Sequence, residues 1–231
     1  MLAPDKPAAP RGQLRKTSVS QQIYDALRIR VLSLELVPGE NLSRAEIAGF
    51  YGVSQTPVRD AMLKLEEEGL LVIFPQSKTE VSRIDVNHAR ETQFLRMSVE
   101  IEVAKQLATY GAPGATDTAR AILRRQKSAQ EAHDLTYFEE LDRAFHGALL
   151  ESAGLESLWT LISERSGQID RLRKLNLPVA GKAVEVIDAH CAILDAIQNR
   201  DAGEAEKHVR IHLSGTLVQV NQIIARNPEF F

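Results

Sequence analysis

The sequence predicts a mainly α-helical fold of two domains, an N-terminal winged helix-turn-helix followed by an all-α helical bundle. The chain of 231 residues is longer than one typical domain. Apolar residues recur at helical spacing over most of its length. Two short segments, 70–74 and 79–83, alternate instead like a pair of strands. We therefore expect a flexible arm at 1–17, a first domain at 18–84 and a second at 85–231.

Composition excludes several classes of protein. The hydrophobic fraction of 44% and the charged fraction of 26% are those of a soluble globular chain. No apolar run reaches the roughly 18 residues of a membrane helix, and residues 1–16 lack the apolar core of a secretory signal. The single cysteine, Cys191, excludes an intrachain disulfide and any metal site built from several thiolates. We expect a cytoplasmic protein with no membrane partner.

The first domain begins with an amphipathic helix over about 18–34. Ile23, Leu27 and Val31 share one face of it, and Ser18 or Ser20 supplies the N-cap. The turn signal Pro38-Gly39 is expected to end this helix.

Two shorter helices follow. One begins at Ser43 and ends at Gly52, where glycine allows a left-handed turn. The next is capped by Ser54 or Thr56 and carries Pro57 in its first turn, where the missing N–H costs nothing. Its expected buried stripe consists of Val58, Ala61, Met62 and Leu65.

The two strands follow Gly69 and flank the turn Pro75–Lys78, so a wing completes the helix-turn-helix. Such a motif reads DNA through side chains at the start of its second helix. A two-helix motif that merely packs is the alternative, and the wing and the cap count against it. The expected DNA-contacting residues are Arg59, Thr56, Gln55, Ser54, Arg44, Lys64 and Lys78.

Charge does not single out the DNA-binding domain. Residues 1–80 carry ten basic and ten acidic side chains, so the net charge of -3 comes from the rest of the chain. A positive surface then depends on arrangement, with Glu66–Glu68 turned away from the DNA. The basic residues available for it are Arg11, Arg15, Lys16, Arg28, Arg30, Arg44, Arg59 and Lys64.

Several short motifs lie along this domain. They are Pro38-Gly39, Leu42-Ser43, Glu46-Ile47-Ala48, Gly52-Val53-Ser54, Thr56-Pro57-Val58-Arg59, Ala61-Met62, Leu65 and Glu68-Gly69-Leu70. In these motifs residues 18–83 resemble the GntR family of bacterial transcription regulators. The resemblance implies DNA contacts from Arg59 and Thr56. The chain departs from the family where Ala45 and Gln55 replace frequent arginines and Lys78 replaces the usual wing glycine.

Beyond Asp85 the pattern is helical throughout, broken only by short turn signals. A compact all-α bundle without a sheet is expected. Its six predicted helices lie near 86–110, 115–132, 134–152, 155–175, 182–199 and 202–225.

Four polar residues fall on the expected inner faces of that bundle. Asp142 and His146 are one helical turn apart. His190 and His212 each lie eleven residues from a turn near Asp201, so antiparallel helices would place them side by side. A lone inward histidine is more often an ordinary core residue, but four such groups at compatible heights favour a divalent metal. Carboxylate and imidazole suit zinc best here, with nickel, manganese or iron as alternatives.

The second domain also resembles a known one. Its motifs are Asp142-Arg143-Ala144-Phe145-His146, His190 with Ile193-Leu194-Asp195-Ala196-Ile197, and His212-Leu213. They resemble the FCD ligand-binding domain of the FadR subfamily, in its six-helix VanR-type version. The resemblance implies four metal ligands, a homodimer, and a small organic acid as effector at or beside the metal. It also implies that Arg96 faces the effector, and Glu100, one turn later, is the second candidate.

These observations predict a homodimeric transcription regulator, a repressor, whose affinity for double-stranded operator DNA responds to a small organic acid. A metal-dependent enzyme that activates water at the same site is one alternative. For an enzyme of this kind, the sequence offers no general base other than Glu100, and the first domain would have no evident role. A direct metal sensor is the other alternative.

Overall fold

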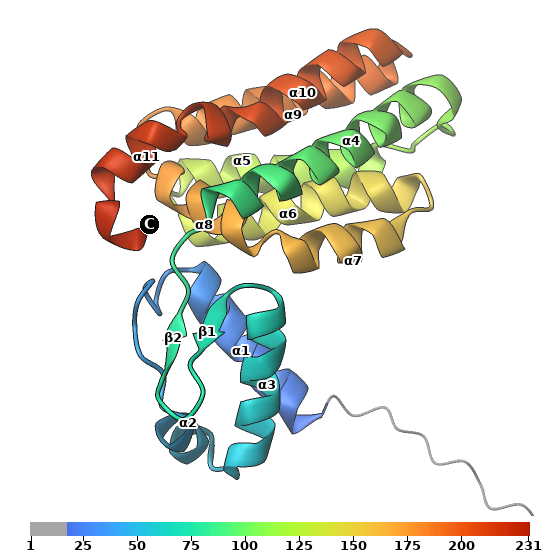
Figure 1. The fold of residues 1–231 in the computed structure, drawn as a ribbon. Helices are drawn as coiled ribbons and strands as arrows, with labels where there is room; N and C mark the ends of the chain where they lie inside the picture. Colours follow the sequence, from blue (N-terminus) through green and yellow to red (C-terminus); the bar gives the residue numbers. More distant parts are fainter. Residues whose placement is uncertain (1–17) are drawn as a thin grey trace, which may run out of the picture.

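The computed structural model describes residues 18–231, so the arm expected at 1–17 lies outside the described residues. Figure 1 shows a small domain of helices and a hairpin below a larger, purely helical domain. The expected mainly α fold is therefore confirmed. Within the described part, no helix combines the length and the apolar character that crossing a membrane requires.

The smaller domain packs three helices against a two-stranded antiparallel sheet, with Leu71 opposite Val81. Its elements are α1 (Val19–Leu32), α2 (Arg44–Tyr51), α3 (Gln55–Glu67), β1 (Leu71–Ile73) and β2 (Thr79–Val81). The expected stripe of α3 is buried against α1, with Val58 and Leu65 fully inaccessible. Both strands are shorter than predicted, because the ladder pairs only three residues on each side.

Local chemistry explains where these helices begin and end. Ser18 Oγ accepts a hydrogen bond from Gln21 N at 3.1 Å, and Ser43 Oγ caps α2 in the same way. Gly52 has a φ of 66° and ends α2 as predicted. Helix α1 ends at Leu32, two residues before the predicted end at about Leu34, because Leu34 adopts a left-handed backbone with φ 62°.

The larger domain is a layered bundle in which α10 runs beside α4 and α9, and α5 runs beside α6 (Figure 1). Its main core lies between these helices and includes the fully buried Phe145, Leu150 and Leu194. The elements are α4 (Val86–Tyr110), α5 (Asp117–Glu131), α6 (Leu135–Ser152), α7 (Glu156–Arg165), α8 (Gly167–Asn176), α9 (Lys182–Gln198), α10 (Ala202–Val218), α11 (Val220–Arg226) and the 3₁₀ turn η1 (Pro228–Phe230).

The prediction of six helices was wrong at two places. The segment 155–175 is broken at Ser166, whose buried Oγ donates to Ile162 O at 2.7 Å and so competes with the helical ladder. The segment 202–225 is broken at Gln219, which leaves helical geometry with φ -96° and ψ 6°. Both segments keep an apolar period across the break, which is why periodicity alone joined them.

Helix α8 holds the two domains together. The side chain of Arg171 is fully buried, and its Nη1 donates to Ser82 O at 2.7 Å. Burial lowers the pKa of Arg171 to about 10. Gln168 Nε2 donates to Gly69 O at 2.7 Å, and Ile84 N donates to Phe230 O from the end of the chain. The linker around 82–84 is therefore clamped on both sides.

Candidate functional site

The exposed end of the smaller domain gathers the residues expected to contact DNA. Ser54, Gln55, Thr56 and Arg59 are all exposed on the first turns of α3, and Arg44 is exposed at the start of α2. Lys78 lies in the turn between β1 and β2, where its Nζ pairs with Glu80. Six of the seven predicted residues thus lie on the surface of the helix-turn-helix or its wing.

Lys64 differs from the prediction that it faces outward. It is half-buried, its Nζ lies 3.9 Å from the centre of the Tyr24 ring, and it donates to Gln21 Oε1. Arg28 is also turned inward, because its Nη2 donates to Ser163 O in the larger domain. Both cations serve packing of α1 instead of extending the positive surface.

The acidic run Glu66–Glu68 at the C-terminal end of α3 is mostly directed away from the exposed turns. Glu66 Oε1 accepts a hydrogen bond from Ile73 N, and Glu68 Oε2 accepts one from Arg28 Nε at 2.7 Å. Only Glu67 of the three is exposed. Glu66 and Glu68 are therefore turned away from the exposed turns of α3, as a positive DNA-binding surface on this domain requires.

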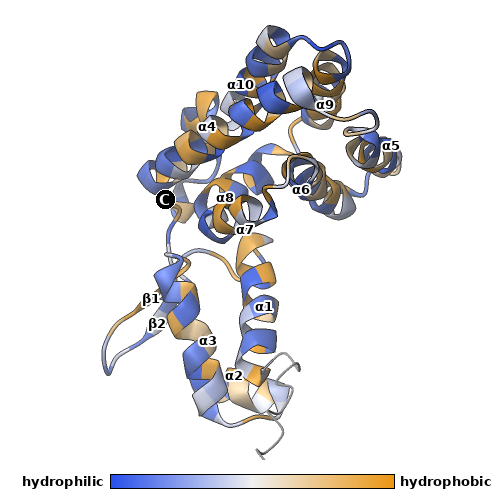
Figure 2. Ribbon diagram, turned by 90° about the vertical axis from the view of Figure 1, so that its right-hand side faces the viewer, coloured by the Kyte–Doolittle hydropathy of each residue, from blue (hydrophilic) through white to orange (hydrophobic). Residues whose placement is uncertain are grey.

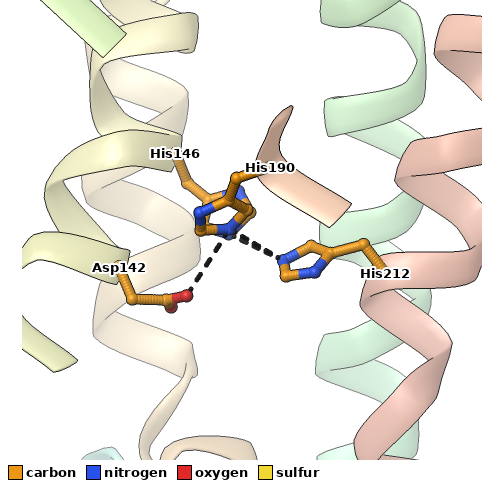
Figure 3. A group of neighbouring side chains, drawn as sticks. All are labelled: Asp142, His146, His190 and His212. Atoms are coloured by element: carbon orange, nitrogen blue, oxygen red, sulfur yellow. Dashed lines mark hydrogen bonds and ion pairs between the residues drawn. The ribbon is translucent and has the colours of Figure 1, made fainter. Parts of the chain in front are cut away.

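In the larger domain, three imidazoles and one carboxylate meet at a single point (Figure 3). Asp142 and His146 come from α6, His190 from α9 and His212 from α10. His212 Nε2 lies 3.2 Å from both His190 Nε2 and His146 Nε2, and Asp142 Oδ1 lies 3.6 Å from His190 Nε2. One ligand atom from each residue falls within 4.8 Å of all the others. These spacings suit atoms that surround a common centre at about 2 Å.

Two of the imidazoles are fixed by partners behind them. His146 Nδ1 lies 2.6 Å from Glu100 Oε2, and His190 Nδ1 lies 2.9 Å from Gln126 Oε1. An ionised carboxylate and an amide oxygen only accept, so each Nδ1 carries the proton. The Nε2 lone pairs of His146 and His190 then face the centre, as metal ligands require.

The carboxylate of Asp142 is buried but ionised. Burial raises the pKa of Asp142, but the adjacent Arg173 guanidinium outweighs that effect and brings it well below the usual range. Its Oδ2 accepts from Arg173 Nη2, whereas Oδ1 has no hydrogen-bond partner within the described residues. Burial also lowers the pKa of His190 to about 3, and it lowers that of His212. An anionic oxygen therefore lies beside the neutral imidazoles of His190 and His212.

Arg96 and Glu100 form a buried pair beside this cluster. Arg96 Nε donates to Glu100 Oε1 at 2.5 Å, and the two side chains are 2% and 4% exposed. Burial alone would raise the pKa of Glu100, but the opposing effect of Arg96 and His146 is larger and lowers this pKa to about 2. Glu100 thus supports His146 and lines neither large cavity, which differs from its expected role in binding the effector. Arg96 Nη2 has no hydrogen-bond partner in the part of the chain that the structure describes.

A cavity of about 490 Å³ adjoins the cluster and is strongly cationic. Among the described residues that line it are Arg96, Arg173, Lys182 and Arg210, against the single carboxylate of Glu185. His212 forms part of its wall. We refer to it as the cationic cavity.

Sequence reasoning missed Gln126 and Arg173, which hold His190 and Asp142. Gln126 is fully buried, but its partner His190 is 64 positions away in the sequence, and Arg173 is 31 positions from its partner Asp142. No local pattern marks either residue. His88, His133 and His208 are not part of the cluster.

Two family models match this chain. The model for bacterial regulatory proteins of the gntR family matches residues 19–81, and that for the FCD domain matches residues 91–215.

Similar proteins and structures cover nearly the whole chain. An uncharacterized HTH-type transcriptional regulator in an unstable DNA locus of Streptomyces ambofaciens is 36% identical, over 91% of this chain and 89% of its own. The HTH-type transcriptional repressor RspR of Escherichia coli is 32% identical, over 95% of this chain and 96% of its own. The solved structure of E. coli McbR/YncC shares the fold with a TM-score of 0.74 at 20% identity, covering 90% of this chain and 99% of that one.

Proposed function

We infer the function from the family: the chain belongs to the gntR family of bacterial regulatory proteins and carries an FCD domain, so it is a DNA-binding transcription regulator and not an enzyme. We propose that it is a repressor controlled by a small organic acid bound beside a divalent metal. The observation that carries the proposal is the convergence of His146, His190, His212 and Asp142 beside the cationic cavity.

The donor set fits a divalent ion. The unpaired Asp142 Oδ1 and the outward-held Nδ1 protons of His146 and His190 leave the inner atoms free to coordinate. Three nitrogens and one oxygen suit zinc first, then nickel, manganese or iron. Asp142, His146, His190 and His212 would hold the ion, which would supply an electrophilic point for an incoming carboxylate.

The effector is proposed to be an anion because of the charge that lines the cationic cavity. Four cationic side chains face one carboxylate there, and Arg96 Nη2 is buried without a partner. A buried unpaired donor costs free energy that a carboxylate would recover. Arg96 is therefore the residue that we assign to the effector.

Operator recognition is assigned to the exposed turns of α3. Arg59 and Thr56 would contact base edges or phosphate, with Ser54, Gln55 and Arg44 beside them and Lys78 at the wing. We propose a homodimer reading two half-sites, with α4 and α10 as the contact surface. Phe94 on α4 and Ile211 on α10 support it, since these apolar side chains are 75% and 61% exposed.

Helix α8 offers a physical route between the two events. Arg173 reaches Asp142 in the cluster, and Arg171, two positions earlier, reaches Ser82 in the linker. A shift of α8 when the effector binds would therefore reposition the smaller domain. Coupling of this kind is typically worth about 1–3 kcal/mol.

Operator binding tests the first half of the proposal. An operator would be selected from random DNA with the native protein and its affinity measured by fluorescence anisotropy. Arg59→Ala should lower that affinity by about 1–3 kcal/mol. Arg124→Ala, an exposed arginine on α5, is the control and should bind normally. Equal affinities of native protein and Arg59→Ala would refute the assignment.

A thermal-shift screen of small organic acids tests the second half, because a ligand that binds only the folded state raises its stability. An acid that stabilises the native protein should fail with His190→Ala and with Arg96→Met. It should also change operator affinity of the metal-loaded protein. If the metal alone changes operator affinity and no acid does, the protein is a direct metal sensor instead.

A further inference from the structure

A second cavity, of about 530 Å³, lies between the two domains. One wall comes from Ile29 and Leu32 near the end of α1, which in Figure 2 rises from the smaller domain to end beneath α6–α8. The opposite wall comes from Phe138 on α6 and Leu177 just after α8. We refer to it as the interdomain cavity. It differs in composition from the cationic cavity, although Arg173, Lys182, Val186 and Thr216 border both and the cluster residue Asp142 lies in its wall.

The charges that line the interdomain cavity are balanced. Among the described residues in its wall, five cationic side chains face five carboxylates. Most are already paired across it: Arg143 with Asp170, Arg173 with Asp142, and Lys174 with Glu139. No net charge is therefore left in the wall to attract an ion.

Besides Asp142 Oδ1 of the metal-ligand cluster, the buried polar groups in the wall that lack a partner within the described residues belong to Asn176 and Glu139. Asn176 is 1% exposed, and neither its amide nitrogen nor its amide oxygen has a hydrogen-bond partner within the described residues. Leaving both groups of a buried amide unpaired is costly, and a ligand that offers one acceptor and one donor would satisfy both. Glu139 Oε1 is likewise buried without a partner in the described part of the chain, while Oε2 pairs with Lys174.

We propose that the interdomain cavity is a second ligand site, which takes an uncharged molecule with a flat apolar ring and a carboxamide-like edge. Asn176 recognises the edge with a donor and an acceptor, and Leu32, Phe138 and Leu177 contact the ring. Neither the metal cluster nor the effector is needed for this binding.

The site has a consequence for regulation. A ligand here touches α1 of the DNA-binding domain and α6 and α8 of the larger domain at the same time. It therefore favours the domain arrangement in which both walls are present, and its binding is linked to operator affinity.

Benzamide is the probe, because it combines the ring and the amide edge without charge. Binding to the native full-length protein would be measured by titration calorimetry and located by soaking crystals. Benzoate, which is charged, and toluene, which lacks the edge, are the matched comparison compounds and should each bind at least about tenfold more weakly.

Two variants make the assignment falsifiable. Asn176→Leu removes the unpaired amide and should weaken benzamide binding about tenfold or more. Ile29→Ser alters a side chain that is 67% exposed, so the fold should persist, and it should weaken binding about threefold by removing apolar contact.

The control is Arg124→Ala, which changes an exposed side chain on α5 outside the cavity and should leave benzamide binding unchanged. Full binding to Asn176→Leu, loss of binding in Arg124→Ala, or only water beside Asn176 in soaked crystals would each overturn the proposal. None of these outcomes depends on whether an organic acid binds the cationic cavity.

Discussion

At the scale of single residues, the metal cluster depends on groups that do not face its centre. Glu100 fixes the proton of His146 on Nδ1, and Gln126 does the same for His190. Arg96 in turn neutralises Glu100. A proton fixed on the outer nitrogen leaves the inner nitrogen as a permanent acceptor, so these partners would set the affinity of the proposed metal site without contacting the ion.

Glu100→Gln should therefore weaken metal binding about 10- to 100-fold. The amide is a poorer acceptor than the carboxylate, and its loss of charge leaves Arg96 buried without a counter-ion. Competition with a chromogenic chelator would measure the affinity. Glu102→Gln is the matched control, because Glu102 lies on the same helix with a side chain that is 73% exposed. The same affinity in both variants would contradict the role given to Glu100.

At the scale of elements, the break between α7 and α8 lets the larger domain receive the smaller one. A Cβ on Gly167 would lie 2.6 Å from Leu70 Cδ2, and Leu70 is fully buried. The glycine is thus required by close packing between domains. Its neighbour Ser166 bends the chain so that Gln168 and Arg171 reach Gly69 and Ser82.

Gly167→Ala should lower the free energy of unfolding by about 1–3 kcal/mol, because the added methyl overpacks the contact with Leu70. Urea unfolding followed by circular dichroism would measure it. Gly49→Ala is the control: its Cβ meets nothing within 4 Å inside α2, so the better helix former should stabilise by up to about 1 kcal/mol. Equal stability of Gly167→Ala and native protein would show that Leu70 shifts at no cost.

At the scale of the whole molecule, the proposed metal ties together helices from distant parts of the chain. The ligands span α6, α9 and α10, and the unfolded chain has no such cluster. An ion that binds only the folded state adds about 4 kcal/mol when its free concentration is about 1,000 times its Kd.

Removal of the metal by a chelator should therefore lower the Tm of the native protein by about 10 °C. Zinc added back should restore it. His190→Ala should show a low Tm that neither the chelator nor zinc changes. An identical Tm of native protein with and without chelator, with metal content confirmed by mass spectrometry, would argue against a stabilising ion.

The sequence alone determined the fold class, the caps and glycine that bound α2, the buried stripe of α3 and the identity of the four clustered residues. These features follow from local spacing: a helical period places Asp142 beside His146, and equal distances from one turn bring His190 to His212. Local patterns of this kind need no knowledge of the rest of the chain.

Only the tertiary structure decided the partners behind the cluster, the turning of Lys64 toward α1, the breaks at Ser166 and Gln219, and the two cavities. The partners, the orientation of Lys64 and the cavities depend on contacts between segments far apart in the chain, whereas the two breaks are local departures that a continuous apolar period hides. Periodicity reports which face of a helix is buried, but it carries no information about which distant side chain covers that face or where two domains leave a space.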